Sequence, residues 1–328
     1  MVGKTLGHYK ILEPLDAGGM GEVYRDDPHE EEAKFMSKRL GFLATAAVCA
    51  LSIGGVAPAE PAQADTQAQK TEAPVHEIAE VNGFSMAYRD VGEGEPLVLL
   101  HGFMGTGAQW SGVLDDYTAH YRVILPDLRG HGRSTNPDGT FTHRQAARDV
   151  FALLDQLGVD RFRGMGGSTG AMTLLHMATR QPERVEAMVL VAGTTYFPER
   201  ARDIMRTVNP DAAPAEILEE RAQQQGHVRG GEQLRALLTL FRDFQHNYDD
   251  MNFTAPYLST ITAHTLIVHG DRDEFFPVSI PVEMYEAIPN SYLWIVPNLG
   301  HGVSMESETG RRLVETALDF LSGAWERR

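Results

Sequence analysis

The chain of 328 residues contains few cysteines and few basic side chains. Its one cysteine, Cys49, excludes an intramolecular disulfide and a cysteine-rich metal site. Lys and Arg number 29 against 45 Asp and Glu, and the net charge is −16. This balance argues against a general nucleic-acid binder, because such proteins neutralise phosphates with clustered cations. With 42% apolar residues, the chain is long enough to form one large globular domain.

The first 35 residues carry part of a phosphate-binding motif but not the rest of it. The run GGMGEV at 18–23 lies in a segment, 6–24, that resembles the opening of a bacterial Ser/Thr protein kinase, with Asp16 in place of the first loop glycine. The lysine strand, catalytic loop and metal-binding motif of kinases do not follow in the sequence. We therefore interpret residues 1–35 as a fragment without kinase function.

Residues 36–64 have the three regions of a secretory signal peptide in the right order. Lys and Arg at 38–39 precede an apolar stretch at 40–56, and the small-residue sequence Ala-Gln-Ala occupies 62–64. The alternative is an uncleaved membrane anchor. We disfavour it because two glycines and polar residues make the stretch marginal for spanning a bilayer.

A signal peptide acts at the N-terminus, so we expect translation to start at Met36 and the preceding residues to reflect a misassigned start or a joined fragment. The protein is then exported to the periplasm or secreted, without a stable membrane anchor after cleavage. If residues 1–35 are retained, it is cytoplasmic. N-terminal sequencing of native protein tests this, because a mature chain that still carries Val2 contradicts export. Residues 65–74 are expected to form a linker.

From residue 75 onward, short apolar runs alternate with helical patterns. A hairpin with Asn82 and Gly83 at its turn comes first. Short apolar strands separated by helices predict an α/β fold with a mostly parallel sheet. The expected strands are 75–81, 84–90, 97–100, 122–125, 162–165, 185–191, 265–269 and 292–296, and the expected helices include 142–157, 169–181 and 307–325.

The pentapeptide Gly-Gly-Ser-Thr-Gly at 166–170 is the most informative motif. It lies between an expected strand and an expected helix, which is the context of a nucleophile elbow. The backbone of such an elbow turns so sharply that its neighbours must be small, and Gly166 and Gly170 meet that need. The motif therefore predicts that Ser168 lies exposed at the apex of a strained turn.

Three other motifs follow apolar runs. His-Gly-Phe occupies 101–103, two acids lie at 271 and 273, and His301 follows the last expected strand. The chain order Ser, Asp, His is that of α/β-hydrolases and differs from the orders in chymotrypsin and subtilisin. Together with PDLRGHGRS at 126–134, these motifs make residues 75–328 resemble the α/β-hydrolase fold superfamily. The resemblance implies an eight-stranded, mostly parallel sheet flanked by helices.

The resemblance also implies a role for each member of a catalytic triad. Ser168 is the expected nucleophile and His301 the base that takes its proton, because a serine hydroxyl is weakly nucleophilic alone. Asp273 is preferred to Asp271 as the acid, because it fits the family pattern of glycine, two residues, aspartate and a following proline. The expected acid fixes the histidine tautomer and stabilises the imidazolium.

Two backbone N–H groups are expected to form the oxyanion hole. By family position they belong to Phe103 and Thr169. Met104 occupies a place where many relatives have proline, and Gly167 before the serine is a further departure from the family pattern. The other motif histidines, at 101 and 131, are expected to be structural.

A helix-rich excursion separates Thr194 from Thr260. In the superfamily, an insertion after the sixth strand forms a cap over the active site, so the resemblance implies a cap at about 195–260. Apolar residues here are candidates to line the substrate pocket, although most are expected to pack within the cap itself. These candidates are Phe197, Met205, Leu237, Leu240, Phe241 and Phe244.

The expected activity is hydrolysis of carboxylic esters through an acyl-enzyme, without a metal or other cofactor. Relatives that open epoxides or cleave haloalkanes use aspartate as the nucleophile, and this chain has Ser168 in that place. Lactonase, amidase, C–C bond hydrolase and perhydrolase activities use similar triads and stay open. A noncatalytic ligand-binding protein and a kinase-linked signalling protein are alternatives of other classes. The expected partner is a small-molecule ester rather than a nucleic acid.

Overall fold

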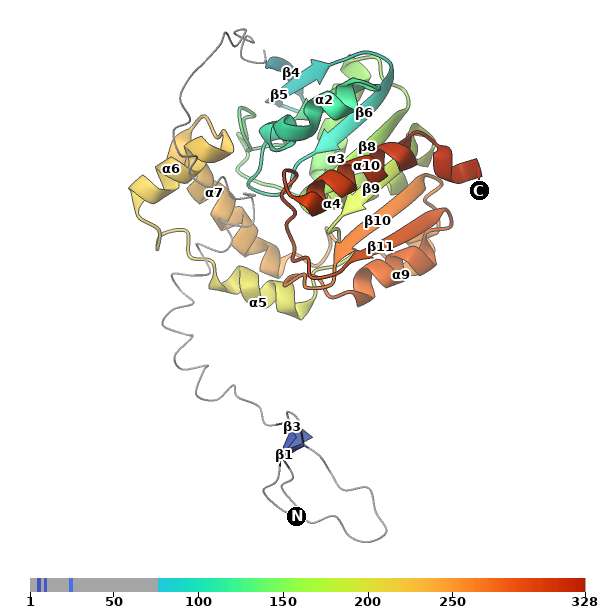
Figure 1. Cartoon of the computed structure of the whole chain (residues 1–328). Helices are drawn as coiled ribbons and strands as arrows, with labels where there is room; N and C mark the ends of the chain where they lie inside the picture. The colour runs from blue at the N-terminus through green and yellow to red at the C-terminus, as the bar shows by residue number, and fades with distance from the viewer. Residues whose placement is uncertain (1–4, 7–8, 11–23, 26–75, 328) are drawn as a thin grey trace, which may run out of the picture. The chain divides into compact units, whose positions relative to one another are not determined.

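The computed structural model describes residues 5–6, 9–10, 24–25 and 76–327 (Figure 1). The chain divides into two units, Met1–Leu43 and Ala44–Arg328. The predicted signal peptide, the linker and most of the kinase-like loop lie outside the described residues. In the first unit, three short strands form an antiparallel sheet: β1 (Thr5–Leu6), β2 (Tyr9–Lys10) and β3 (Tyr24–Arg25).

An eight-stranded sheet forms the centre of the second unit, in the order β11-β10-β9-β8-β6-β7-β5-β4. The pairs β4–β5 and β5–β7 are antiparallel, and all other neighbours are parallel. The predicted mostly parallel eight-stranded sheet is therefore confirmed. Its strands are β4 (Glu77–Val81), β5 (Phe84–Val91), β6 (Glu95–Leu100), β7 (Tyr121–Pro126), β8 (Phe162–Gly167), β9 (Val185–Val191), β10 (His264–Gly270) and β11 (Ser291–Val296).

Both faces of the sheet are covered by helices (Figure 1). The central strand β6 shows why its sequence is a continuous apolar run. Leu97 and Leu99 pack in one hydrophobic cluster, and Val98 and Leu100 pack in the other. Successive side chains of a strand point to opposite faces, so a strand covered on both sides must be apolar throughout.

The flanking helices divide between these two clusters. Helices α3, α4 and α9 bury residues in the cluster of Leu100, whereas α2 and α10 bury residues in that of Leu99. Thr142 and Ser307 begin α3 and α10 by accepting hydrogen bonds from backbone N–H groups of the first turns. The bounds are α2 (Leu114–Thr118), α3 (His143–Gln156), α4 (Thr169–Arg180), α8 (Ala255–Leu258), α9 (Ser279–Ala287) and α10 (Glu308–Leu321).

The last predicted helix ends earlier than expected. Helix α10 stops at Leu321, and a short 3₁₀ helix, η4 (Ala324–Arg327), follows it. Gly323 between them has a φ of 77°, a left-handed conformation that interrupts the α-helix.

A helical insertion lies between β9 and β10. We use this name for α5 (Glu199–Thr207), α6 (Ala215–Gln225), α7 (Gly230–Asp243) and η3 (Phe244–His246). The three α-helices gather at one side of the sheet (Figure 1). The sequence predicted a helix-rich segment here, between Thr194 and Thr260. The assignment of a cap at about 195–260 stays a prediction.

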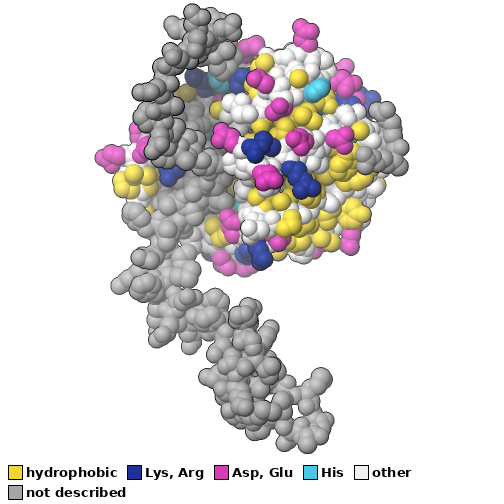
Figure 2. All heavy atoms as spheres, in the orientation of Figure 1, with side chains coloured by type: hydrophobic (Ala, Val, Ile, Leu, Met, Phe, Trp, Pro, Cys, Tyr) yellow, Lys and Arg dark blue, Asp and Glu magenta, His cyan; other side chains and the backbone are white. Residues whose placement is uncertain are grey.

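The surface has the charge balance that the composition predicts. On the face drawn in Figure 2, Asp and Glu side chains are scattered between isolated Lys and Arg side chains. Among the described residues, no helix has both the length and the hydropathy needed to cross a membrane.

Candidate active site

The four predicted motifs meet because each follows the carboxyl end of a parallel strand. Phe103 follows β6, Ser168 follows β8, Asp273 follows β10 and His301 follows β11. Parallel strands present these ends along one edge of a sheet, which is where open α/β sheets bind ligands. Residues as far apart in the sequence as Phe103 and His301 are thereby brought to the same edge of the sheet.

Ser168 lies in a strained turn between β8 and α4. Its φ and ψ are 49° and −111°, outside the backbone regions that residues other than glycine commonly adopt. A Cβ at Gly166 would overlap the backbone of Gly170, and one at Gly170 would overlap the carbonyl of Leu100. Two glycines therefore allow the close approach of strand and helix that holds the serine at the apex.

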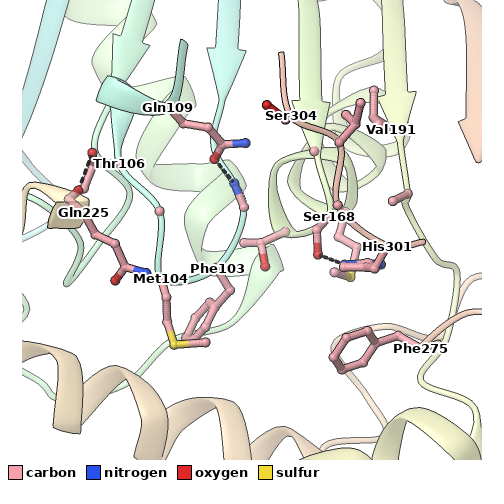
Figure 3. Close-up of a pocket in the computed structure, with 18 of the residues that line it drawn as sticks. Phe103, Met104, Thr106, Gln109, Ser168, Val191, Gln225, Phe275, His301 and Ser304 are labelled. Carbon is pink, nitrogen blue, oxygen red and sulfur yellow. Dashed lines mark hydrogen bonds between the residues drawn. The ribbon is translucent and has the colours of Figure 1, made fainter. Parts of the chain in front are cut away.

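Ser168, His301 and Asp273 form a continuous hydrogen-bonded chain. The Nε2 atom of His301 lies 2.9 Å from Oγ of Ser168 (Figure 3), and its Nδ1 atom lies 2.8 Å from Oδ2 of Asp273. Both distances are in the range of good hydrogen bonds. The second predicted acid, Asp271, instead accepts a hydrogen bond from the backbone N–H of Asn298.

The surroundings of Asp273 determine which atoms carry protons in the hydrogen-bonded chain of Ser168, His301 and Asp273. Its carboxylate is buried, and Oδ1 accepts hydrogen bonds from the N–H groups of Phe275 and Phe276 at 2.8 and 2.9 Å. Burial alone raises the pKa of Asp273, but the hydrogen bond and charge of His301 and the Phe276 N–H outweigh it, so the pKa is lowered. The ionised acid must accept the Nδ1 proton of His301. Nε2 is then free to accept the proton of Ser168.

A second histidine lies behind the acid. His269 is buried, and Nε2 lies 2.9 Å from the carbonyl oxygen of Phe276 and 3.5 Å from Oδ2 of Asp273. The carbonyl can only accept, so Nε2 carries a proton. Burial lowers the pKa of His269, which keeps it neutral beside Asp273.

The two predicted oxyanion-hole residues flank Ser168. Thr169 lines the same cavity as the serine, and so does Phe103. Figure 3 shows Phe103 in this cavity with Ser168. The Phe103 loop is held from inside by His101, whose Nδ1 lies 2.8 Å from the Gly102 carbonyl and whose Nε2 accepts the Leu128 N–H at 2.9 Å. His101 thus has the structural contacts expected of it.

A cavity of about 620 Å³ opens beside Ser168 and His301. Its walls are rich in aromatic side chains, and Phe244 packs against Phe103 edge to face and stacks on Phe197. Among the described residues that line the cavity, none is Lys or Arg, whereas Glu274 and Glu306 are present. A cavity with aromatic walls and interspersed polar side chains suits a small molecule that is apolar in part.

The helical insertion supplies part of this wall. Of the six apolar residues predicted there, Phe197, Met205, Phe241 and Phe244 line the cavity. Leu237 and Leu240 do not line it, and all six pack in or against the same hydrophobic cluster. Sequence reasoning missed Gln109, Gln225 and His143, which also line the cavity. No motif marks these residues, since only the folded chain brings them to the serine.

His143 forms a second histidine–aspartate pair beside the cavity. Its Nδ1 atom lies 2.7 Å from Oδ2 of Asp250, and its Nε2 atom lies 3.4 Å from Oγ1 of Thr169. Burial raises the pKa of Asp250, but hydrogen bonds from the side chain of His143 and from the backbone N–H groups of residues 143 and 144 lower it to about 2. The pair joins the segment after the insertion to the first turn of α3.

The described residues contain no group of three or more His, Cys, Asp or Glu side chains arranged to hold a metal ion. The side chains beside Ser168 are those of acid–base and nucleophilic chemistry.

Comparisons with known proteins agree with this fold. A family model described as the alpha/beta hydrolase fold matches residues 95–240. A 2-hydroxy-6-oxo-6-(2'-aminophenyl)hexa-2,4-dienoic acid hydrolase from Metapseudomonas resinovorans is 24% identical over 280 residues, which cover 79% of this chain and 96% of the relative. A 2-hydroxy-6-oxo-2,4-heptadienoate hydrolase from Pseudomonas putida is 28% identical, covering 73% of this chain and 94% of the relative.

Among solved structures, an esterase from Rhodococcus sp. is similar over 76% of this chain and 99% of its own, with a TM-score of 0.58 and 26% identity. Fold, strand order and family match point to one class of protein. The chain has the α/β-hydrolase fold and is a hydrolase.

Proposed function

We propose that the protein is a serine hydrolase that cleaves carboxylic esters through an acyl-enzyme. The observation that carries this proposal is the hydrogen-bonded chain from Ser168 through His301 to Asp273 at the edge of a cavity with aromatic walls. Similarity to an esterase supports the reaction class.

In the first half-reaction, His301 removes the proton of Ser168 as the serine oxygen attacks the ester carbonyl carbon. The backbone N–H groups of Phe103 and Thr169 donate to the oxyanion of the tetrahedral intermediate. Collapse of the intermediate breaks the bond to the alcohol, and His301 gives the proton to that alcohol. Asp273 stays ionised throughout and stabilises the imidazolium.

In the second half-reaction, His301 removes a proton from water, which attacks the acyl-enzyme carbonyl. The second tetrahedral intermediate collapses to the carboxylic acid, and the proton returns to Ser168. Acid and alcohol are the only products, so no cofactor is needed.

The charge of the cavity favours a neutral ester over the acids named for the relatives. The hydrolase from Metapseudomonas resinovorans is named for a dienoic acid. A carboxylate that leaves water is best held by Arg or Lys, and the cavity lining among the described residues has neither. Glu274 and Glu306 would repel a second carboxylate. C–C bond cleavage of such acids is therefore the second candidate activity, and only the activities named for the relatives support it.

Hydrolysis of p-nitrophenyl esters from acetate to long acyl chains tests the proposal, with Ser168→Ala alongside. We expect the native protein to release p-nitrophenol and the variant to lose the activity. An unchanged rate in Ser168→Ala would exclude the proposed mechanism. Turnover of dienoic acids but of no ester would establish the second candidate instead.

A further inference from the structure

The loop that follows β6 has a backbone conformation that needs outside support. Met104, next to Phe103, has a φ of 62°, in the left-handed region that favours glycine. Three residues later, Gly107 donates its N–H to Oδ1 of Asp127 at 2.8 Å, which fixes the far end of the loop. The direction of the Phe103 N–H depends on how the backbone between these points is held.

A buried histidine of the helical insertion holds this backbone. His227 lies between α6 and α7 and is 3% exposed. Its Nε2 atom lies 2.9 Å from the carbonyl oxygen of Met104, and its Nδ1 atom accepts the backbone N–H of Gly132 at 3.0 Å. One imidazole therefore joins the loop after β6 to the loop after β7, 123 and 95 residues away.

The two partners fix the tautomer of His227. The Met104 carbonyl can only accept, so Nε2 must carry a proton, and the Gly132 N–H can only donate, so Nδ1 must be unprotonated. The ring is thus neutral when both bonds form. Burial, with His101 and Arg229 nearby, lowers the pKa of His227 to about 4, although the Met104 carbonyl and Asp127 oppose this shift.

A second hydrogen bond joins the end of α6, just before His227, to the loop after β6. Oγ1 of Thr106 donates to the carbonyl oxygen of Gln225 at 2.9 Å, at the end of α6 (Figure 3). Gly226 follows with a φ of 82°, a left-handed helix end that turns the chain toward His227. The insertion thus contacts the loop both before and after Gly105.

We propose that His227 is a positioning residue for the oxyanion hole. Through the Met104 carbonyl it holds the loop so that the Phe103 N–H points at the oxyanion, without itself touching substrate. Oxyanion stabilisation depends on donors that are already aimed where charge develops, so a loosened loop lowers the rate of the chemical steps more than substrate binding. The inference rests on the proposed function, since it assigns a role within that same site.

The test compares three variants with the native protein, using p-nitrophenyl butyrate. His227→Leu removes both hydrogen bonds. His227→Gln keeps one N–H donor and one acceptor on a side chain of similar reach. His176→Leu is the matched control, because His176 is also buried with a pKa lowered to about 4. It lies on α4 and packs against Phe253.

We expect His227→Leu to lower kcat about 10- to 100-fold while KM changes less than about threefold. Affinity for a trifluoromethyl ketone, which forms a tetrahedral oxyanion adduct on the serine, should fall by a similar factor. His227→Gln should recover most of the loss, and His176→Leu should keep the native kcat. Thermal melting of each variant reports folding separately.

A folded His227→Leu variant with native kcat and native ketone affinity would overturn the inference. If this variant does not fold, His227→Asn takes its place, because its shorter amide cannot reach both partners and carries the same expectation. A native protein that hydrolyses no ester would count against the proposed function instead. The ketone adduct would then still report whether His227 supports the oxyanion site.

Discussion

The Nδ1 atom of His301 lies 2.8 Å from Oδ2 of Asp273, whereas the neighbouring Asp271 binds the backbone N–H of Asn298. Two acids that are two residues apart after the same strand therefore have different partners. The difference gives the chain an internal control for the role of the acid.

Replacing Asp273 by Asn should lower kcat by about 10⁴-fold, because an amide stabilises the wrong histidine tautomer and removes the charge beside the imidazolium. Asp271→Asn should keep kcat within about threefold, since this side chain does not contact His301. Steady-state hydrolysis of p-nitrophenyl butyrate by both variants checks the assignment. Equal losses in the two variants would contradict it.

The nucleophile turn should be intolerant of a single methyl group. Gly170→Ala places a Cβ against the Leu100 carbonyl and should lower the free energy of unfolding by about 1–3 kcal/mol or more. Gly112→Ala is the control, because a Cβ there meets only Glu306 at ordinary contact distance, 3.9 Å, and should change stability by less than about 1 kcal/mol. Urea unfolding measures both. A Gly170→Ala variant as stable as the control would contradict the prediction, because it would show that the turn can accommodate a Cβ at residue 170.

Acid should destabilise the protein through its buried neutral histidines. Burial lowers the pKa of His176 and His227 to about 4, against 6.5 in the unfolded chain. Between pH 6.5 and pH 4 the unfolded chain binds more protons than the folded one, so the free energy of unfolding falls as pH falls. Each histidine contributes a slope of up to about 1.4 kcal/mol per pH unit.

Urea midpoints measured from pH 7 to pH 4.5 check this prediction. His176→Leu removes one of these contributions and should make the curve less steep below pH 6. A stability that stays constant across the window would show that these imidazoles are already accessible to protons in the folded state.

The cavity should discriminate against a second negative charge on the substrate. We expect kcat/KM for p-nitrophenyl hexanoate to exceed that for mono-p-nitrophenyl adipate by about tenfold or more, because the terminal carboxylate loses hydration without meeting a cation. Glu306→Gln should narrow the gap by improving only the adipate ester. A preference for the adipate ester would instead favour acidic substrates like those named for the relatives.

Most of the fold could be predicted from the sequence, because buried parallel strands have continuous apolar sequences. The strand at Val185–Val191 has its predicted bounds, and the others differ by a residue or two at their ends. Strand ends are harder to predict because backbone pairing can continue past the last apolar residue, as at Gly167. Gly323 ended a helix that an apolar periodicity alone would have continued.

The sequence also predicted Ser168, Asp273 and His301 as site residues, because short motifs mark the turns that follow the strands. It could not predict the link between His227 and Met104, which are 123 residues apart. Every residue has a backbone carbonyl, so a side chain that binds one does not require a particular residue type at that position. No sequence motif therefore marks the contact. The same holds for Gln225 and His143, whose place at the cavity depends on how the insertion packs.

Trapping the nucleophile tests the central claim most directly. Diethyl p-nitrophenyl phosphate transfers a diethylphosphoryl group to an activated serine and releases p-nitrophenol, and the adduct can be located by peptide mass spectrometry. We predict one equivalent of p-nitrophenol per chain, the added mass on Ser168 alone, and no labelling of Ser168→Ala. An adduct on another residue, or full ester hydrolysis after Ser168 is blocked, would contradict the account.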